Sequence, residues 1–415
     1  MREVNVGHKY LADYQSIVAK GLMAEIAELA EPLQGKRVLH VNATAFGGGV
    51  AEILYTLVPL VSDIGLEAHW QILTAPPEFF NVTKSFHNGL QGHAVDFPAE
   101  SRALYEEVCR ANAAELTRPY DFVVIHDPQP LAIRDFVTRS QDRSTWWIWR
   151  CHIDTSTPDQ DLYDYLLPSI NQYDAAVYTL ADYVPKGLTV PVREIAPTID
   201  PLAPKNMKLA PEDAAYIVRQ FGIDVDRPLL LQVSRFDPWK DPLGVVDVYR
   251  LVKAQRPDVQ LALVGSMASD DPEGWEYLER VMDYAGGDED VFILSNLDNV
   301  GSVEINAFQC VADVVLQKST REGFGLTVSE ALWKARPTIG GAVGGIPLQI
   351  EDGVTGYLVS SVAECAQRCL EVMDDPEAAR RMALLGKEHV RRNFLTPRAL
   401  RDYLRLFTEL EKGSR

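Results

Sequence analysis

The stretch that most constrains this chain is residues 319–330, which read STREGFGLTVSE. An apolar run at 313–317 precedes it and a helical run at 330–334 follows, an order that predicts strand, glycine loop and helix. Gly323 and Gly325 lack a Cβ atom, so the loop backbone can pass close to a ligand. Free N–H groups at the helix start can donate to an anion or to sugar hydroxyls. The stretch therefore predicts a site for a polyhydroxylated, phosphate-bearing molecule.

Two carboxylates, Glu322 and Glu330, are separated by seven residues in this stretch. A carboxylate accepts two hydroxyl hydrogen bonds, which suits a vicinal diol. Glu is a common residue, so the spacing alone indicates only two solvated glutamates on a surface loop. The Gly-Phe-Gly between the carboxylates, the preceding strand and the following helix favour a binding site instead.

The length and composition of the chain indicate two or three domains of ordinary globular type: 415 residues, 47% hydrophobic and 24% charged. No apolar run approaches the roughly 20 residues of a membrane span. The first eight residues contain no apolar signal region, so a cytoplasmic location is expected. The net charge of −19 argues against nucleic acid and anionic membranes as partners. The five cysteines are odd in number and lack C-x2-C spacing, so neither a disulfide framework nor a zinc site is expected.

The first half of the chain alternates between strand and helix patterns. After a helical lead-in at 8–33, strands are expected at 36–42, 66–73, 120–126, 144–152, 175–179 and 193–196. Gly47, Gly48 and Gly49 lie between the first strand and a helix at 53–60, which predicts an anion site. The loop matches neither G-x-G-x-x-G nor a Walker sequence, so ordinary dinucleotide and P-loop sites are disfavoured. Residues 81–91 form a polar insertion, either a plain surface loop or a cover over a sugar site.

Polar side chains follow several of these expected strands. In open parallel sheets, ligands bind beyond the carboxyl ends of the strands. The residues predicted there are Asn42, His126, Asp127, Gln129, His152 and Asp154. A lone histidine at a strand end is usually structural, but polar residues at successive ends predict a binding site.

The second half begins after a proline-rich linker at 197–204. Further strands are expected at 228–234, 259–265 and 291–297. Arg235 and Lys240 share the loop after the first of these strands. A planar guanidinium and a point-charge ammonium together suit a diphosphate, whereas a solvated cationic pair is the simpler alternative.

Residues 319–330 and the segment SRFDPWKD at 234–241 resemble the E-x7-E and S-R-x4-K signatures of retaining glycosyltransferases. The resemblance is to the GT-B members of family 4, of the glycogen synthase and sucrose synthase type. It implies an α/β fold of two Rossmann-like β/α/β domains facing across a cleft. The acceptor domain would span 1–197, with a terminal helix at about 395–415 packing back on it. The nucleotide-sugar donor domain would span 198–394.

Residues 41–52, 79–88 and 149–154 resemble trehalose glycosyltransferring synthases and the related retaining trehalose phosphorylases. Those phosphorylases tend to be longer chains, so this length favours the synthase type. The resemblance implies that NDP-glucose and glucose give α,α-trehalose and NDP with retention, in a reaction that also runs in reverse.

The resemblance also implies roles for individual residues. Arg235 and Lys240 would stabilise charge on the departing diphosphate, helped by the amides of Gly47, Gly48 and Gly49. Glu330 would hold the ribose diol, and His152 would lie near the donor sugar. The donor glucose would be held by Glu322, Gly323, Phe324, Gly325 and Leu326. The base pocket would include Asn296 and Leu297. The acceptor would meet Asn42, His126, Asp127, Gln129 and Asp154.

Retention commonly uses two carboxylates about 5 Å apart and a covalent intermediate. No carboxylate in this sequence is evidently a nucleophile. The resemblance implies instead a front-face substitution in which the leaving phosphate takes the acceptor's proton. No metal is required in that mechanism, although Mg²⁺ could assist the nucleotide.

Three other functions remain open from the sequence. A trehalose phosphorylase would use inorganic phosphate in place of NDP. A sugar-nucleotide epimerase of GT-B fold would show no dependence on an acceptor sugar. A non-catalytic sugar-nucleotide sensor would bind without turnover.

The choice among UDP-, ADP- and GDP-glucose is also open, as is a homodimer. A phosphorylated acceptor would need a further cation, which Lys84 or Arg150 could supply.

Overall fold

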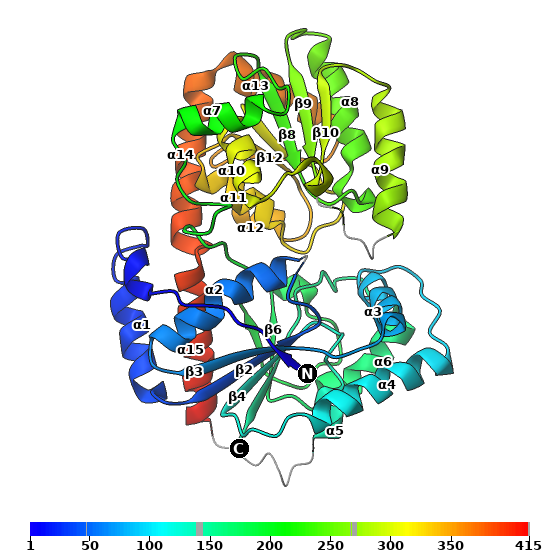
Figure 1. The fold of residues 1–415 in the computed structure, drawn as a ribbon, viewed down its shortest axis with the longest axis vertical. Helices are drawn as coiled ribbons and strands as arrows, with labels where there is room; N and C mark the ends of the chain where they lie inside the picture. The colour runs from blue at the N-terminus through cyan, green and yellow to red at the C-terminus, as the bar shows by residue number, and fades with distance from the viewer. Residues whose placement is uncertain (47, 138–143, 266, 268–271, 414–415) are drawn as a thin grey trace. The chain divides into compact units, whose positions relative to one another are not determined.

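The computed structural model describes the whole chain except residues 47, 138–143, 266, 268–271 and 414–415. The chain forms two compact units (Figure 1). Unit 1 comprises Met1–Thr198 together with Thr396–Arg415, and unit 2 comprises Ile199–Leu395. The division falls one residue beyond the boundary expected at 197, and the C-terminal helix belongs to unit 1.

The described residues of unit 1 form a seven-stranded sheet in the order β1-β3-β2-β4-β5-β6-β7. Neighbouring strands are parallel except β1, which runs antiparallel to β3. Strands β4 and β5 are almost wholly buried, the pattern of parallel strands covered on both faces. The strands are β1 (Arg2–Glu3), β2 (Arg37–Asn42), β3 (Glu67–Ile72), β4 (Phe122–His126), β5 (Trp146–Arg150), β6 (Ala175–Tyr178) and β7 (Val192–Glu194).

Helices cover both faces of this sheet. One face packs against α3 (Pro77–Leu90), α4 (Ala99–Ala114), α5 (Ile133–Phe136) and α6 (Gln160–Ile170). The other lies under α15 (Thr396–Lys412), which also contacts α1 (Leu22–Ala30) and α2 (Gly49–Asp63). Phe407 of α15 stacks on Phe122 of β4 with ring centroids 4.3 Å apart. Short 3₁₀ turns are η1 (Leu11–Tyr14), η2 (Glu31–Leu33) and η3 (Ala181–Tyr183).

The segment 81–91, predicted as a polar insertion, is instead most of helix α3. Pro77 occupies its first turn, where the missing N–H costs nothing. Phe79, Phe86 and Leu90 lie on one buried face at helical spacing, and this apolar stripe outweighs the polar composition of the segment.

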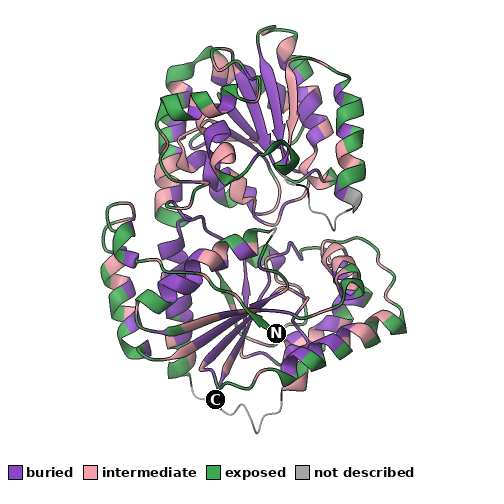
Figure 2. Cartoon of the chain, in the orientation of Figure 1, coloured by how far each residue is buried: buried purple, intermediate pink, exposed green. Residues whose placement is uncertain are grey.

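The described residues of unit 2 form a six-stranded parallel sheet in the order β10-β9-β8-β11-β12-β13. Numbered within the unit, this is the 3-2-1-4-5-6 order of a Rossmann fold. The strands are β8 (Leu229–Val233), β9 (Gln260–Val264), β10 (Val291–Leu294), β11 (Val314–Gln317), β12 (Thr338–Gly341) and β13 (Tyr357–Val359). Figure 2 shows the central strands β8, β9, β11 and β12 buried, whereas β10 at the edge is only partly buried.

Two sets of helices sandwich the sheet of unit 2. One face packs against α8 (Pro242–Lys253), α9 (Pro272–Ala285), α13 (Val362–Asp374) and α14 (Pro376–Asn393). The other packs against α7 (Pro211–Arg219), α10 (Ser302–Val311) and α11 (Leu326–Trp333). Shorter elements are η4 (Pro238–Lys240), η5 (Asn296–Asp298) and α12 (Ile346–Gln349). Strand β10 ends at Leu294, three residues before the predicted end, because Ser295 and Asp298 cap η5.

Each sheet has one position where the strand order reverses, and ligands bind beyond the carboxyl ends of strands at such positions. In unit 1 this position lies between β2 and β4, and in unit 2 between β8 and β11. Most of the predicted site residues follow these four strands in the chain.

Candidate functional site

Two loops meet at the strand-order reversal of unit 2. The loop after β8 carries Lys240, and the loop after β11 carries Glu322. Lys240 Nζ lies 2.6 Å from Glu322 Oε2, and both side chains are largely buried. The N–H of Thr320 donates to the carbonyl of Trp239 at 2.8 Å, which joins the two backbones. The sequence stretches that predicted a site separately are therefore one local structure.

Three donors converge on one oxygen of Glu322. Besides Lys240, Ser319 Oγ donates to Oε2 at 3.1 Å and Gln317 Nε2 donates at 3.3 Å. A second ion pair, Lys318 with Asp241, ties the same loops together. Charge-assisted hydrogen bonds of this kind hold a carboxylate in one orientation.

Arg235 is more exposed than Lys240. Its guanidinium Nη2 lies 3.4 Å from Asp237 Oδ2, and 55% of the side chain is accessible. An exposed guanidinium at the end of β8 can reorient toward an anion at little cost. The structure thus places both predicted diphosphate cations on one short loop.

The glycine loop of 323–325 is supported from behind by α12. Gln349 Nε2 donates to the carbonyls of Phe324 at 2.5 Å and Gly325 at 3.3 Å. A Cβ on Gly345 would lie 2.7 Å from the carbonyl oxygen of Gly323, so a glycine is required there. Gly325 has a φ of +81°, which L residues rarely adopt. Leu326 begins α11 directly after it.

Glu330 lies in α11 and is 2% exposed. Lys205 Nζ approaches its Oε1 at 3.4 Å, and Gln309 Nε2 approaches its Oε2 at 3.4 Å. Burial lowers the pKa of the neighbouring Lys334 to about 8. The ribose-binding role of Glu330 stays a prediction.

The predicted base pocket residues differ in what they do. The amide of Asn296 is engaged with the backbone of Met267, since Oδ1 accepts its N–H at 2.6 Å and Nδ2 donates to its carbonyl at 3.2 Å. Leu297 of η5 is 59% exposed, so an apolar side chain is accessible just beyond β10. Asn306 of α10 donates from Nδ2 to the carbonyls of Pro204 and Met207 at 2.9 and 2.8 Å.

A row of histidines crosses the strand-order reversal of unit 1. His40 of β2, His126 of β4 and His152 after β5 come from neighbouring strands. His40 Nδ1 and His126 Nε2 are 3.0 Å apart, as are His126 Nδ1 and His152 Nε2. Both ring nitrogens of His126 are thereby used within unit 1, and its side chain is 1% exposed. This geometry does not fit the direct acceptor contact predicted for His126.

Asp127 follows this row with a φ of +63°. Its Oδ1 accepts the backbone N–H of His152 at 2.7 Å. Burial raises the pKa of Asp127 to about 6, although the His152 N–H and the charge of Arg150 act in the opposite direction. This left-handed backbone conformation is strained for a residue other than glycine, and such strained residues are frequent in binding sites.

The other predicted acceptor residues of unit 1 are held by local hydrogen bonds. Asn42 Oδ1 accepts from Trp70 Nε1 at 2.7 Å, and its Nδ2 donates to the carbonyl of Thr44 at 2.7 Å. Each polar group of Asn42 therefore has one structural partner, and its role as an acceptor ligand stays a prediction. Asp154 Oδ1 accepts from the backbone N–H and the hydroxyl of Ser156.

Gln129 lies in the turn after β4, half-buried, and its carbonyl accepts from Cys109 Sγ at 3.6 Å. Gly48 is the N-cap of α2 and Gly49 begins the helix, whereas Gly47 lies outside the described residues. Within the part of the chain that the structure describes, no side-chain hydrogen bond caps α2 at Gly48. The anion site expected at this helix N-terminus stays a prediction.

Of the two cations suggested for a phosphorylated acceptor, Arg150 is 1% exposed. Its Nε and Nη1 have no hydrogen-bond partner among the described residues. Burial thus removes Arg150 as a surface cation, while Lys84 of α3 is half-buried.

Sequence reasoning missed His40, Gln317 and Gln349. His40 carried a usable signal, because it lies two residues before Asn42 and so on the same face of a buried strand. Gln317 also carried a signal, because it ends the expected strand five residues before Glu322, the residue it contacts. Gln349 carried none, since its contact with Phe324 joins residues 25 positions apart.

Two family models match the chain. Residues 40–185 match the N-terminal domain of trehalose synthase, and residues 214–389 match glycosyl transferases group 1. A trehalose synthase of Rubrobacter xylanophilus is 59% identical over 414 residues, covering 99% of both chains. The chain belongs to the trehalose synthase family. It is therefore a glycosyltransferase, as the sequence predicted.

Other relatives are consistent with this family. A trehalose synthase of Pyrococcus horikoshii is 45% identical over 99% of both chains. A trehalose phosphorylase of Pleurotus pulmonarius is 27% identical over 92% of this chain and 58% of its own length.

Solved structures confirm the GT-B fold. A trehalose-phosphate synthase from Burkholderia xenovorans, in complex with glucose-6-phosphate, has a TM-score of 0.72 at 14% identity, covering 90% of this chain and all of its own. Anabaena HepE, in complex with UDP and glucose, has a TM-score of 0.67 at 16% identity, covering 90% of this chain and all of its own.

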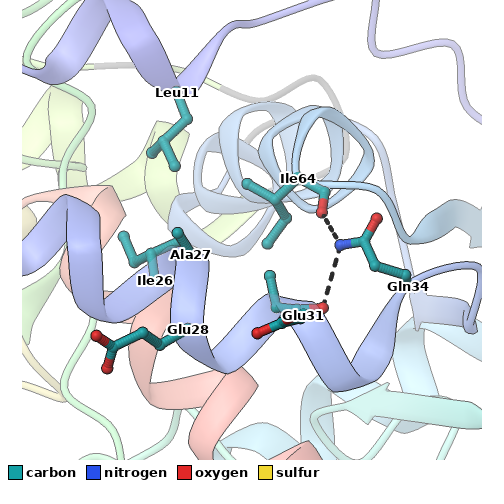
Figure 3. A pocket seen from close by; sticks show the side chains of 8 residues that line it. Leu11, Ile26, Ala27, Glu28, Glu31, Gln34 and Ile64 are labelled. Carbon is teal, nitrogen blue, oxygen red and sulfur yellow. Dashed lines mark hydrogen bonds between the residues drawn. The ribbon is translucent and has the colours of Figure 1, made fainter.

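An open depression of about 510 Å³ lies elsewhere on unit 1, lined mainly by α1 and η2 with Leu11 and Ile64 (Figure 3). Gln34 closes one end by donating to the carbonyls of Ala30 and Ile64. The lining is apolar and includes none of the predicted site residues. Within the described residues, no helix has both the length and the apolarity to cross a membrane.

Proposed function

We propose that this enzyme transfers glucose from a nucleoside diphosphate glucose to free glucose with retention, giving α,α-trehalose and NDP. The observation that carries the proposal is the Lys240–Glu322 pair beside Arg235 at the strand-order reversal of unit 2. A diphosphate leaving group needs cations placed where charge develops, and a buried, preorganised ammonium supplies more stabilisation than a solvated one. Unit 2 is the donor side and unit 1 the acceptor side in this proposal.

The remaining groups of unit 2 bind either the donor sugar or the nucleotide. Glu322 and the loop 323–326 hold the donor glucose, and Glu330 holds the ribose diol. Leu297 packs on the base. The complexes of HepE with UDP and glucose, and of a trehalose-phosphate synthase with glucose-6-phosphate, support sugar nucleotides and sugars as the ligand class.

The reaction proceeds by front-face substitution in this proposal. Glu322 is held by three donors on one oxygen, an arrangement suited to positioning a sugar rather than attacking it. The leaving phosphate takes the proton of the acceptor hydroxyl as the new bond forms, so the step runs in both directions. A metal is not required, and Mg²⁺ assists only by binding the nucleotide.

The phosphorylase is the second candidate, and the relatives weigh against it. The match to a synthase spans both chains end to end at 59% identity. The match to a phosphorylase is 27% identical and spans 58% of that protein. The cytoplasmic location and the homodimer stay predictions.

The test is an NDP-release assay with UDP-, ADP- and GDP-glucose, each with glucose, with glucose-6-phosphate and without acceptor. NMR identifies the product. Glucose-dependent release with an α,α-1,1 product supports the proposal and names the base. NDP release only with glucose-6-phosphate would show that the acceptor is the phosphorylated sugar and not free glucose. Phosphate-dependent breakdown of trehalose without NDP release replaces the synthase by the phosphorylase.

A further inference from the structure

The proposed function assigns no role to the histidine row of unit 1 (His40, His126 and His152), although the family resemblance implies that His152 lies near the donor sugar. Its rings are tilted by 31° between His40 and His126 and by 15° between His126 and His152, with centroids 5.3 Å apart in both pairs. The nitrogen pairs at 3.0 Å are within the range of an N–H···N hydrogen bond. Two strands and the residues just after a third thus align three imidazoles in a single hydrogen-bonded line.

Burial, followed by the charge of Arg150, keeps the row neutral. Burial lowers the pKa of His40 to about 3, and burial together with Arg150 holds the pKa of His152 well below its usual range. The pKa of His126 is lowered by burial, by the two other histidines and by Arg150. Asp127 and the ring of Tyr403 also lie beside this group.

Three neutral imidazoles carry three N–H protons, and the two internal hydrogen bonds use two of them. The third proton must then lie at one end of the row, on His40 Nε2 or on His152 Nδ1. Only two tautomeric states keep both internal bonds, and they differ in the direction in which every proton points.

The buried end of the row selects between these states. His40 is 1% exposed, and no hydrogen bond to its Nε2 is found in the described part of the chain. A buried N–H without a partner is less tolerable than a buried acceptor without one. The favoured state therefore leaves His40 Nε2 unprotonated. His40 Nδ1–H donates to His126 Nε2, and His126 Nδ1–H donates to His152 Nε2.

We propose that His40 and His126 are positioning residues that fix the ring of His152 and make its Nδ1–H a hydrogen-bond donor to a substrate hydroxyl oxygen. His152 is half-buried, and its Nδ1 has no partner among the described residues. Its backbone is held independently by Asp127. The proposal rests on the proposed function only in naming a sugar as the ligand, because the proton order follows from unit 1 alone.

The first test is ¹⁵N NMR of enzyme labelled at histidine, with assignments from single substitutions. Nδ1–H tautomers are expected at all three positions, whereas free histidine favours Nε2–H. A sugar ligand, tested as trehalose alone and with NDP, is expected to shift His152 most. An Nε2–H tautomer or an imidazolium at His152 would overturn the proposal, whether or not the enzyme transfers glucose.

The second test compares His40→Leu with His40→Asn, since an Asn amide can place a donor near the position of Nδ1. His40→Leu is expected to lower kcat about tenfold, the effect of one misdirected hydrogen bond, and to move the His152 resonances. His40→Asn is expected to recover most of both. His69→Asn, on β3 of the same sheet but outside the row, is the matched control.

The outcomes separate the two proposals. If wild-type enzyme transfers no glucose, the proposed function fails and the tautomers still decide the proton order. Equal kcat in His40→Leu and His40→Asn, with unchanged His152 resonances, would overturn the positioning role. If His40→Leu does not fold, the tautomers of the wild type and of His40→Asn give the same decision.

Discussion

Lys240 places its ammonium against Glu322 before any substrate arrives. A side chain of β8 also holds the backbone of Lys240, because Gln232 Nε2 donates to the Lys240 carbonyl at 2.7 Å. Preorganised charge of this kind acts on the transition state without reorganisation.

We expect Lys240→Ala to lower kcat/KM for the NDP-glucose donor by about 10² to 10³-fold, because the departing diphosphate loses its buried cation. Steady-state NDP release measures the effect. Lys208→Ala removes an exposed lysine of the same unit and serves as the control. A kcat/KM within the error of wild type for Lys240→Ala would remove this residue from the proposed site.

Asp127 gives a pH dependence of stability whose sign follows from its raised pKa. Between the unfolded value near 4 and the folded value of about 6, the folded state binds more protons than the unfolded state. The contribution of Asp127 to the free energy of unfolding is therefore fully present below pH 4, and it is lost as the pH rises through 6.

Asp127→Asn keeps an oxygen for the His152 N–H and removes the buried charge. We expect the variant to be more stable than wild type at pH 7 by on the order of 2 kcal/mol, a gain that vanishes below pH 4. Calorimetric unfolding at several pH values measures the difference. A difference independent of pH would show that the charge of Asp127 carries no cost.

The turn between β12 and α12 packs against the glycine loop and supports its backbone. Gly341 and Gly345 approach Ser319 and Gly323 so closely that a Cβ at either glycine would meet a carbonyl oxygen at 2.2 or 2.7 Å. Backbone cannot give way as a flexible side chain can, so the loop would have to move.

Gly345→Ala is therefore expected to raise the KM for the donor about tenfold or more, since small displacements of a binding loop are costly. Gly413→Ala, whose added Cβ would have only ordinary contacts, is the matched control. Donor titration and kinetics measure the change. Wild-type donor KM in Gly345→Ala would contradict the supporting role of this turn.

The chain as a whole consists of two units with separate cores, and the predicted ligands are divided between them. A ligand that binds only folded protein stabilises the unit that holds it.

We expect NDP at a hundred times its dissociation constant to stabilise unit 2 by about 2.7 kcal/mol. Calorimetry follows the unfolding transition of that unit, and the Lys240→Ala variant should lose most of the shift. A nucleotide that raised only the transition of unit 1 would reverse the assignment of the donor side.

Much of this organisation was readable from the sequence because it depends on local pattern. The strand expected at 120–126 contains the buried apolar run 122–125, and Gly323 with Gly325 marks a loop between strand and helix. Those features depend on residues close in the chain, so the strand–loop–helix order and the predicted GT-B fold were confirmed. The polar segment 81–91 was misjudged because burial of Phe79 and Phe86, not average polarity, decides that helix.

The pairings within each site were decided by tertiary structure. Lys240 and Glu322 are 82 positions apart, and His40 and His126 are 86 apart. Residue types alone could name these groups as polar and near strand ends. Only the strand order, which sets β8 beside β11 and β2 beside β4, determines which side chain meets which. The same order turned His126 from an expected substrate ligand into the centre of a buried hydrogen-bonded row.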